Sequence, residues 1–244
     1  MTPQYLEAIA SLLSALAWPV VVIAFVLTQR RALTRLLGRL KRLGTSNVTA
    51  EFGETFEEES EQVLNTDPGA STPPTEKQVL AAERVEQAAR QSDISVVRTQ
   101  VFQLAQEYEQ IRATMPSGDT RTRRMEVVVT KMRTLALAAY PLLRELTNSG
   151  SPGERLAAVA ILQVRPNPDY LDWLVTRLAE EKPFIGYHAG VALLAAVRNL
   201  DPSDYGTKLQ QAIQEARKSV GWKLKDTDRD RVLSDAEKEL REKL

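Results

Sequence analysis

The stretch AAVAILQVRPNPDYLDWL (157–174) returns in outline farther along the chain. Its first part, AAVAIL (157–162), matches AGVALL (189–194) at a spacing of 32 residues. Its second part, PDYLDWL (168–174), matches PSDYGTKL (202–209), with the two Asp-Tyr pairs about 35 residues apart. Each unit is therefore expected to contain an Ala-rich helix, a Pro-containing corner and a second helix. Such units stack on one another, because a single two-helix unit cannot bury its own apolar face.

This pattern resembles HEAT-like helical repeats over roughly residues 120 to 220. The resemblance implies an α-solenoid that serves as a protein-binding scaffold. Composition also favours helices, because aromatic residues make up only 6% of the chain while Ala, Leu and Val abound. Strands would be enriched in aromatic and β-branched residues. We therefore predict an all-α fold with a HEAT-like, α-solenoid domain.

Local signals predict further helices before the repeat. Thr75 stands three residues before a glutamine, the spacing of a capping box, and the helix that it begins should run to about residue 91. Ser92 or Asp93 begins the next helix. A long helix is expected over 120–147, with Pro141 either bending it or ending its first part.

The N-terminal segment has the pattern of a membrane anchor. Residues 9–27 carry no charge, and 19 residues form a helix of roughly 28 Å, close to the ~30 Å core of a bilayer. Six basic residues follow within 30–42, whereas residues 1–7 contain no Lys or Arg. A cleaved signal peptide would carry its basic residues before the apolar run and a small-residue cleavage site after it. We predict a retained single-pass helix in the plasma (inner) membrane, with the N-terminus outside and the C-terminal domain cytoplasmic.

Two features of this predicted span could involve copies of the chain. Pro19, next to Trp18, can kink the helix because it frees a backbone carbonyl one turn earlier. Small residues at Ala10, Ser14 and Ala17 would let two spans pack closely, so a homo-oligomer through this helix is one expectation. The alternative is a tolerated kink with no partner helix. The residues assigned to the anchor are Trp18, Pro19, Arg30 and Arg31.

Leucines recur at three- and four-residue steps among the basic residues of 29–44. This spacing predicts an amphipathic basic helix that lies at the lipid bilayer. Lys and Arg equal Asp and Glu at 32 each, so no net charge attracts nucleic acid, and none is expected as a partner. The segment that follows alternates apolar and polar residues around Phe52, which allows at most a short strand or hairpin. The predicted organisation is an anchor (1–28), a basic juxtamembrane helix (29–44), an acidic and Pro/Ser/Thr-rich linker (45–75) and a helical domain (76–244).

The segment DTDRDRVLSDAE (226–237) places oxygen-bearing residues at positions 1, 3, 5, 9 and 12 of an EF-hand loop. Position 6 of that loop should be glycine, and here it is Arg231. The alternative is that Asp226 or Thr227 caps a C-terminal helix. The weak calcium candidates are Asp226, Asp228, Asp230, Ser234 and Glu237.

The chain contains one histidine, His188, which takes the place of Leu156 when the repeats are aligned. It is expected to be partly buried and satisfied by a neighbouring carbonyl; the alternative is a ligand contact made together with Tyr187. General-base chemistry would need a carboxylate and a nucleophile beside it. A second candidate is a cluster at a helix start, which is either solvated, paired with acidic helices, or an anion site. Its residues are Arg121, Arg123 and Arg124.

Several classes of chemistry have no basis in the sequence. The chain has no cysteine, which excludes disulfides, Cys-based zinc sites and thiol nucleophiles. It has no Walker A, dinucleotide-binding or HExxH motif, so no cofactor is expected. We therefore expect a membrane-anchored, non-enzymatic scaffold or adaptor that binds an unknown protein partner. The alternative is an oligomerising membrane effector of a bacterial stress or defence system, and an unrecognised enzyme is the third option.

Overall fold

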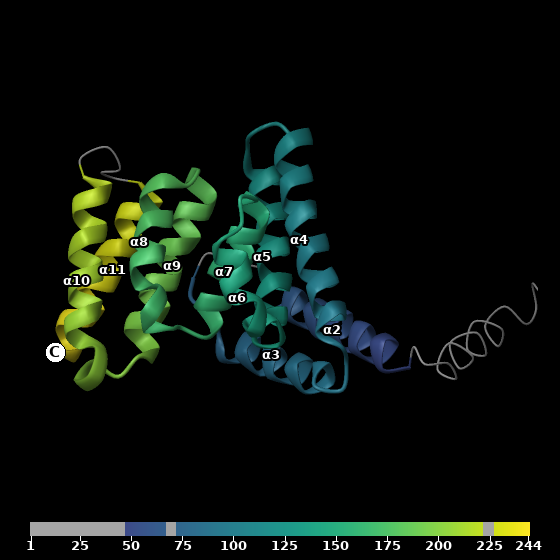
Figure 1. The fold of residues 1–244 in the computed structure, drawn as a ribbon. Coiled ribbons are helices and arrows are strands. Elements are labelled where there is room, and N and C mark those ends of the chain that lie inside the picture. The colour runs from purple at the N-terminus through teal and green to yellow at the C-terminus, as the bar shows by residue number, and fades with distance from the viewer. Residues whose placement is uncertain (1–46, 67–71, 222–226) are drawn as a thin grey trace, which may run out of the picture. The chain divides into compact units, whose positions relative to one another are not determined.

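The computed structural model describes residues 47–66, 72–221 and 227–244 (Figure 1). Every regular element in these ranges is a helix, so the all-α prediction is confirmed. The predicted transmembrane span and basic segment lie outside them, and no helix in the described ranges is long and apolar enough to cross a membrane. The chain divides after Ala50, and the unit Glu51–Leu244 holds the helical domain.

The helices are bounded by recognisable signals. Thr75 Oγ1 accepts a hydrogen bond from the Gln78 amide, and the Asp93 carboxylate accepts one from the Ser95 amide, which confirms both predicted starts. A 3-10 turn at Tyr140–Leu142 interrupts the long helix at the predicted proline. The helices are α2 (Asn47–Thr66), α3 (Glu76–Ala89), α4 (Ile94–Thr114), α5 (Asp119–Ala139), α6 (Leu143–Thr147), α7 (Pro152–Val164), α8 (Leu171–Glu180), α9 (Pro183–Asn199), α10 (Pro202–Val220) and α11 (Asp228–Lys243).

The helices of the domain pack in two rows. In the first row, α3, α5, α7, α9 and α11 each pack against the next. In the second row, α4 lies against α5 and α7, α6 against α7, α8 against α9, and α10 against both α8 and α11. Figure 1 shows α7 between α5 and α9. This arrangement is compatible with the predicted helical-repeat domain.

The two rows account for the repeat seen in the sequence. The Ala-rich segments 157–162 and 189–194 belong to α7 and α9, which are neighbours in the first row. Asp169 and Tyr170 lie in the 3-10 turn before α8, and Asp204 and Tyr205 lie at the start of α10 itself. Helices α8 and α10 are neighbours in the second row. Alanines such as Ala158 and Ala192 are fully buried, so the α7 and α9 backbones can approach closely. The segments that resemble each other in sequence therefore occupy equivalent places in the stack.

The prediction of a linker over 45–75 is wrong for residues 47–66, which form helix α2. Phe52, Phe56 and Val63 are almost completely buried, and their spacing places them on one helical face. Ion pairs join α2 to the domain, from Glu57 to Lys131 of α5 and from Glu59 to Arg84 of α3. The possible strand or hairpin around Phe52 is wrong for the same reason. The alternation of apolar and polar residues ends at Phe52, and from there the apolar residues follow a helical spacing.

Candidate functional site

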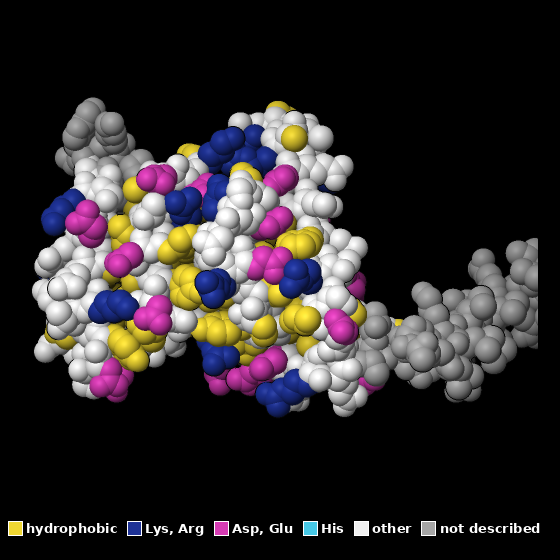
Figure 2. Space-filling model, viewed as in Figure 1, with side chains coloured by type: hydrophobic (Ala, Val, Ile, Leu, Met, Phe, Trp, Pro, Cys, Tyr) yellow, Lys and Arg dark blue, Asp and Glu magenta, His cyan; other side chains and the backbone are white. Residues whose placement is uncertain are grey.

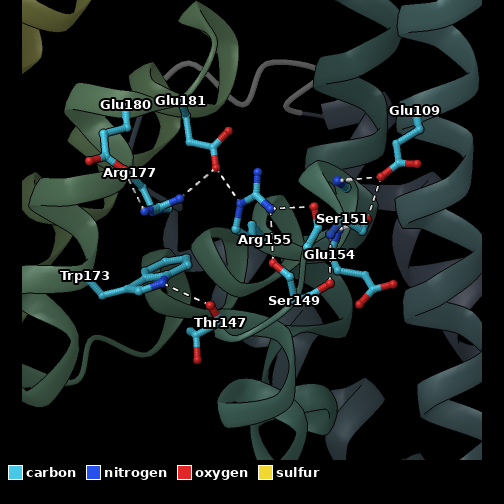
Figure 3. A network of polar contacts seen from close by, with 12 residues as sticks. Glu109, Thr147, Ser149, Ser151, Glu154, Arg155, Trp173, Arg177, Glu180 and Glu181 are labelled. Atoms are coloured by element: carbon cyan, nitrogen blue, oxygen red, sulfur yellow. Dashed lines mark hydrogen bonds and ion pairs between the residues drawn. The ribbon is translucent and has the colours of Figure 1, made fainter.

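A network of charged side chains fixes the junction between α8 and α9 (Figure 3). Glu181 lies between two arginines, and its Oε1 accepts from Arg155 Nε and from Arg177 Nη1 at 3.1 Å. Burial would raise the pKa of Glu181, but the two guanidinium groups outweigh it and leave the pKa lowered. Glu181 is therefore a charged, paired group that holds the end of α8 against the start of α7.

The start of α7 is held from the other side by α4, as Figure 3 also shows. Glu109 of α4 accepts hydrogen bonds from Ser151 Oγ and from the Gly153 amide. A Cβ at Gly153 would lie 2.8 Å from the carbonyl carbon of Ala105, so only glycine fits this approach of α7 to α4. Together, the contacts of Glu181 and Glu109 fix the positions of α7 and α8, the two helices that precede α9.

A cavity of about 520 Å³ opens at the start of α9, between α4, α5, α9 and α11. Its lining includes the first turns of α5, α9 and α11 and one arginine from the last turn of α4. Figure 2 shows basic side chains gathered near the loop that joins α4 and α5. We call this the arginine cavity, after Arg112, Arg121 and Arg229, which lie in its wall.

The arginine cavity brings together three of the residues that the sequence singled out, Arg121, Tyr187 and His188. Arg123 and Arg124 are exposed and do not line it, and Arg124 borders a separate pocket between α4 and α5. Sequence reasoning missed Arg112 and Arg229, because each comes from a distant helix and belongs to no motif. It also missed Phe184, although its three-residue spacing from Tyr187 on α9 predicts a shared face.

Arg112 and Arg121 keep hydrogen-bonding capacity that the rest of the site leaves unused. Arg112 donates one long bond, 3.3 Å, to the hydroxyl of Tyr108. Arg121 donates to the Met115 carbonyl and the Ser117 hydroxyl, while its buried Nε has no partner among the described residues. Neither guanidinium forms an ion pair with a carboxylate in the described ranges. Arg155 and several other arginines of the domain, by contrast, form ion pairs with carboxylates.

Arg229 has a structural role in the cavity wall. Its guanidinium donates to the carbonyls of Leu178 and Glu181 over 2.8 and 2.9 Å, which satisfies the C-terminal end of α8. A Cβ at Gly186 would lie 2.6 Å from Arg229 Cζ, so a glycine on α9 makes room for this side chain. Burial lowers the pKa of Arg229, an effect that the nearby Glu181 opposes.

Aromatic rings of α9 form another part of the cavity wall. The Phe184 ring stacks on Tyr108 with centroids 5.8 Å apart and meets His188 edge-on at 4.5 Å. Tyr187 also meets His188 edge-on, at 5.5 Å. Burial raises the pKa of Tyr187, so its hydroxyl stays protonated at neutral pH. This part of the wall therefore contains aromatic rings and a neutral hydroxyl.

His188 belongs to a buried polar network behind this wall. The residue is only 1% exposed, and its ring Nδ1 lies 3.4 Å from Gln163 Nε2, which donates to the His188 carbonyl over 2.7 Å. Gln163 Oε1 accepts from Arg133 Nε. Burial, and then the charge of Arg133, hold the pKa of His188 well below its ordinary value. The imidazole is therefore neutral at pH 7 and is buried more deeply than the sequence predicted.

Two acidic residues border the cavity. Burial raises the pKa of Glu126, although Arg123 and Arg133 oppose the shift. Asp228 is exposed and pairs with Arg231 one turn later, at 3.0 Å. Neither carboxylate forms an ion pair with the cavity arginines described above, so their positive charge is only partly offset.

The weak EF-hand candidate is not an EF-hand loop in the described part of 226–237. Residues from Asp228 onward form the regular helix α11, and Thr227 Oγ1 accepts from the Asp230 amide as its N-cap. Asp230 and Glu237, two of the weak calcium candidates, both pair with Arg217 of α10. No group of three or more His, Cys, Asp or Glu residues in the described ranges is placed to hold a metal ion, and Asp226 lies outside these ranges. The alternative reading, a Thr227 cap, is confirmed.

No protein-family model matches this chain, and no curated protein or solved structure is significantly similar to it. The function must therefore be argued from the fold and the cavity alone.

Proposed function

We propose that the chain is a membrane-anchored, non-enzymatic scaffold whose helical domain binds a protein partner. The observation that carries this proposal is the stacking of helices in two rows over α3 to α11. Helical hairpins stacked in this way create extended surfaces, and such surfaces bind other proteins. The uncharged residues 9–27 supply the anchor in this proposal.

The chemistry of the arginine cavity favours recognition over catalysis. Its single histidine is buried and neutral, and its ring nitrogen lies beside an amide rather than a carboxylate. The cavity lining includes three arginines and two aromatic side chains, Phe184 and Tyr187, and arginine and tyrosine are among the residue types that dominate binding energy at interfaces. We therefore place recognition, and no reaction, at this site.

The test uses the full-length chain. Membranes that contain the tagged chain are washed with high salt and alkali, and the chain should remain with the lipid unless residues 1–28 are deleted. Proteins crosslinked to the tagged chain are then identified, purified separately and titrated against it. Saturable binding with one stoichiometry supports the scaffold. Failure of every recovered protein to bind when purified would overturn it.

A second candidate function is the oligomerising membrane effector. It is favoured by the size of the arginine cavity, which lies in the range of small-molecule sites. In this case vesicles that contain the full-length chain should leak ions, and the leak should require residues 9–27. Intact vesicles at all protein concentrations would exclude the effector and leave the scaffold unaffected.

A further inference from the structure

The arginine cavity has the dimensions and lining of a site for a small organic anion. Its volume of about 520 Å³ falls within the ~300–1,000 Å³ typical of ligand pockets. We propose that it binds a molecule that carries a phosphate or carboxylate group beside an aromatic or apolar portion. The inference rests on the cavity alone, so it holds for a scaffold and for an effector.

Arg112 and Arg121 provide the anion-binding end. A guanidinium carries five N–H donors in a planar fork that matches the oxygens of phosphate and carboxylate groups. Arg112 uses one donor and Arg121 uses two, and neither is neutralised by a carboxylate of the described residues. An anion would supply both the missing charge and the missing acceptors.

The directions of three helices add to this positive field. The first turns of α5, α9 and α11 all contribute residues to the cavity, among them Thr122, Phe184 and Asp228. A helix N-terminus carries roughly half a positive charge and unsatisfied N–H groups. The helix ends strengthen an anion site here; the arginines define it.

Phe184 and Tyr187 provide the apolar end. The Phe184 ring contacts both Tyr108 and His188, so an aromatic ligand would meet a ring that is already ordered. Stacked or edge-on aromatic pairs add to affinity beyond the burial of their area, by up to about tenfold. The arrangement therefore favours an anion with a ring over inorganic phosphate.

Glu126 limits the affinity of the site. Its carboxylate lies in the lining of the cavity and would repel a bound anion. Replacing Glu126 with glutamine removes this repulsion and keeps nearly the same shape. The E126Q variant should therefore bind the anion more tightly than the unmodified chain.

The test is a titration of the full-length chain in nanodiscs by isothermal calorimetry. Phenyl phosphate is the probe, and inorganic phosphate and phenol each represent one half of it. Phenyl phosphate should bind saturably and at least about tenfold more tightly than either half. Absence of saturable binding by phenyl phosphate would overturn the proposal, and equal affinity for inorganic phosphate would overturn its aromatic part.

Matched variants assign the binding to the cavity. R112Q/R121Q should weaken binding by about tenfold or more, whereas R123Q/R124Q removes the same charge outside the cavity and should change affinity less than about twofold. Equal losses in the two double variants would show that the probe responds only to net charge. A lower affinity in E126Q would contradict the proposed position of the anion. These results do not depend on whether a protein partner is found.

Discussion

Arg133 and Gln163 are hydrogen bonded inside the helical domain, with Arg133 Nε donating to Gln163 Oε1 over 2.7 Å and both side chains at most 1% exposed. The same guanidinium donates to Gln78 Oε1 and to the Thr72 carbonyl. Gln163 in turn donates to the His188 carbonyl. One buried arginine thus connects α5 to α3 and α7 and, through Gln163, to α9.

Replacing Gln163 with leucine should destabilise the domain by about 3 kcal/mol. The change leaves a charged donor of Arg133 and the carbonyl of His188 without this partner in the core, and each unsatisfied buried group costs about 1–3 kcal/mol. Urea unfolding followed by circular dichroism measures the loss. Gln103→Leu on the exposed side of α4 is the matched control and should change the free energy of unfolding by under ~0.5 kcal/mol. A loss as small as the control's would show that the network contributes little.

His188 should make the domain less stable in mild acid. Its pKa in the folded state lies well below 6.5, because burial disfavours the charged ring. The unfolded chain therefore takes up a proton first as the pH falls through about 6.5, and folding loses stability down to the lowered pKa. Between pH 7 and pH 5 the loss should approach about 2 kcal/mol from this one group.

The control for this prediction is the same pH series on His188→Gln. The variant has its own baseline stability, so only the slope of unfolding free energy against pH is compared. The slope between pH 7 and pH 5 should flatten in the variant. An unchanged slope would show that His188 does not titrate between the folded and unfolded states in this range.

The sequence predicted the helices wherever the signal was local. The caps at Thr75 and Asp93 and the break at Pro141 each depend on residues close together in the chain, and the repeat between α7 and α9 depends on the likeness of two short segments. Helix α2 was missed because its high content of acidic residues suggested a linker, although Phe52 and Phe56 lie on one buried face. Acidic content describes the solvated face of a helix and gives no information about the other face.

The candidate site could be predicted only in part. Arg121, Tyr187 and His188 were singled out by residue type and position, but nothing in the sequence placed them in one cavity. Arg112 and Arg229 enter the cavity through the packing of α4 and α11, which no local pattern encodes. Tertiary contacts also determine the role of the C-terminal acidic segment, where Arg217 of α10 pairs with Asp230 and Glu237, two of the weak calcium candidates.

Gly153→Ala and Gly53→Ala should have opposite effects on stability. A Cβ at Gly153 would overlap the backbone of Ala105, which cannot move as a side chain could, so α7 must shift away from α4. The expected loss is about 2–3 kcal/mol, typical of overpacking. Gly53 lies within α2 and a Cβ there meets nothing within 4 Å, so alanine should stabilise the helix by about 0.5–1 kcal/mol. Thermal unfolding of both variants tests the pair, and a stabilised G153A would contradict the close approach of α7 to α4.

Glu181→Gln should destabilise the domain by about 2–4 kcal/mol at pH 7, because it leaves the guanidinium groups of Arg155 and Arg177 close together without their shared counter-charge. The matched control is Glu180→Gln, which removes an ion pair between Arg177 and a carboxylate that is 68% exposed, and should cost under ~1 kcal/mol.

The pKa of Glu181 is lowered in the folded state. The contribution of Glu181 to stability is therefore present above its ordinary pKa of 4.5 and is lost as the pH falls through the lowered pKa. The difference in unfolding free energy between the unmodified chain and E181Q should therefore be largest at pH 7 and decrease towards pH 3. A gap that stays constant over this range would show that the network contributes through shape and not through the charge of Glu181.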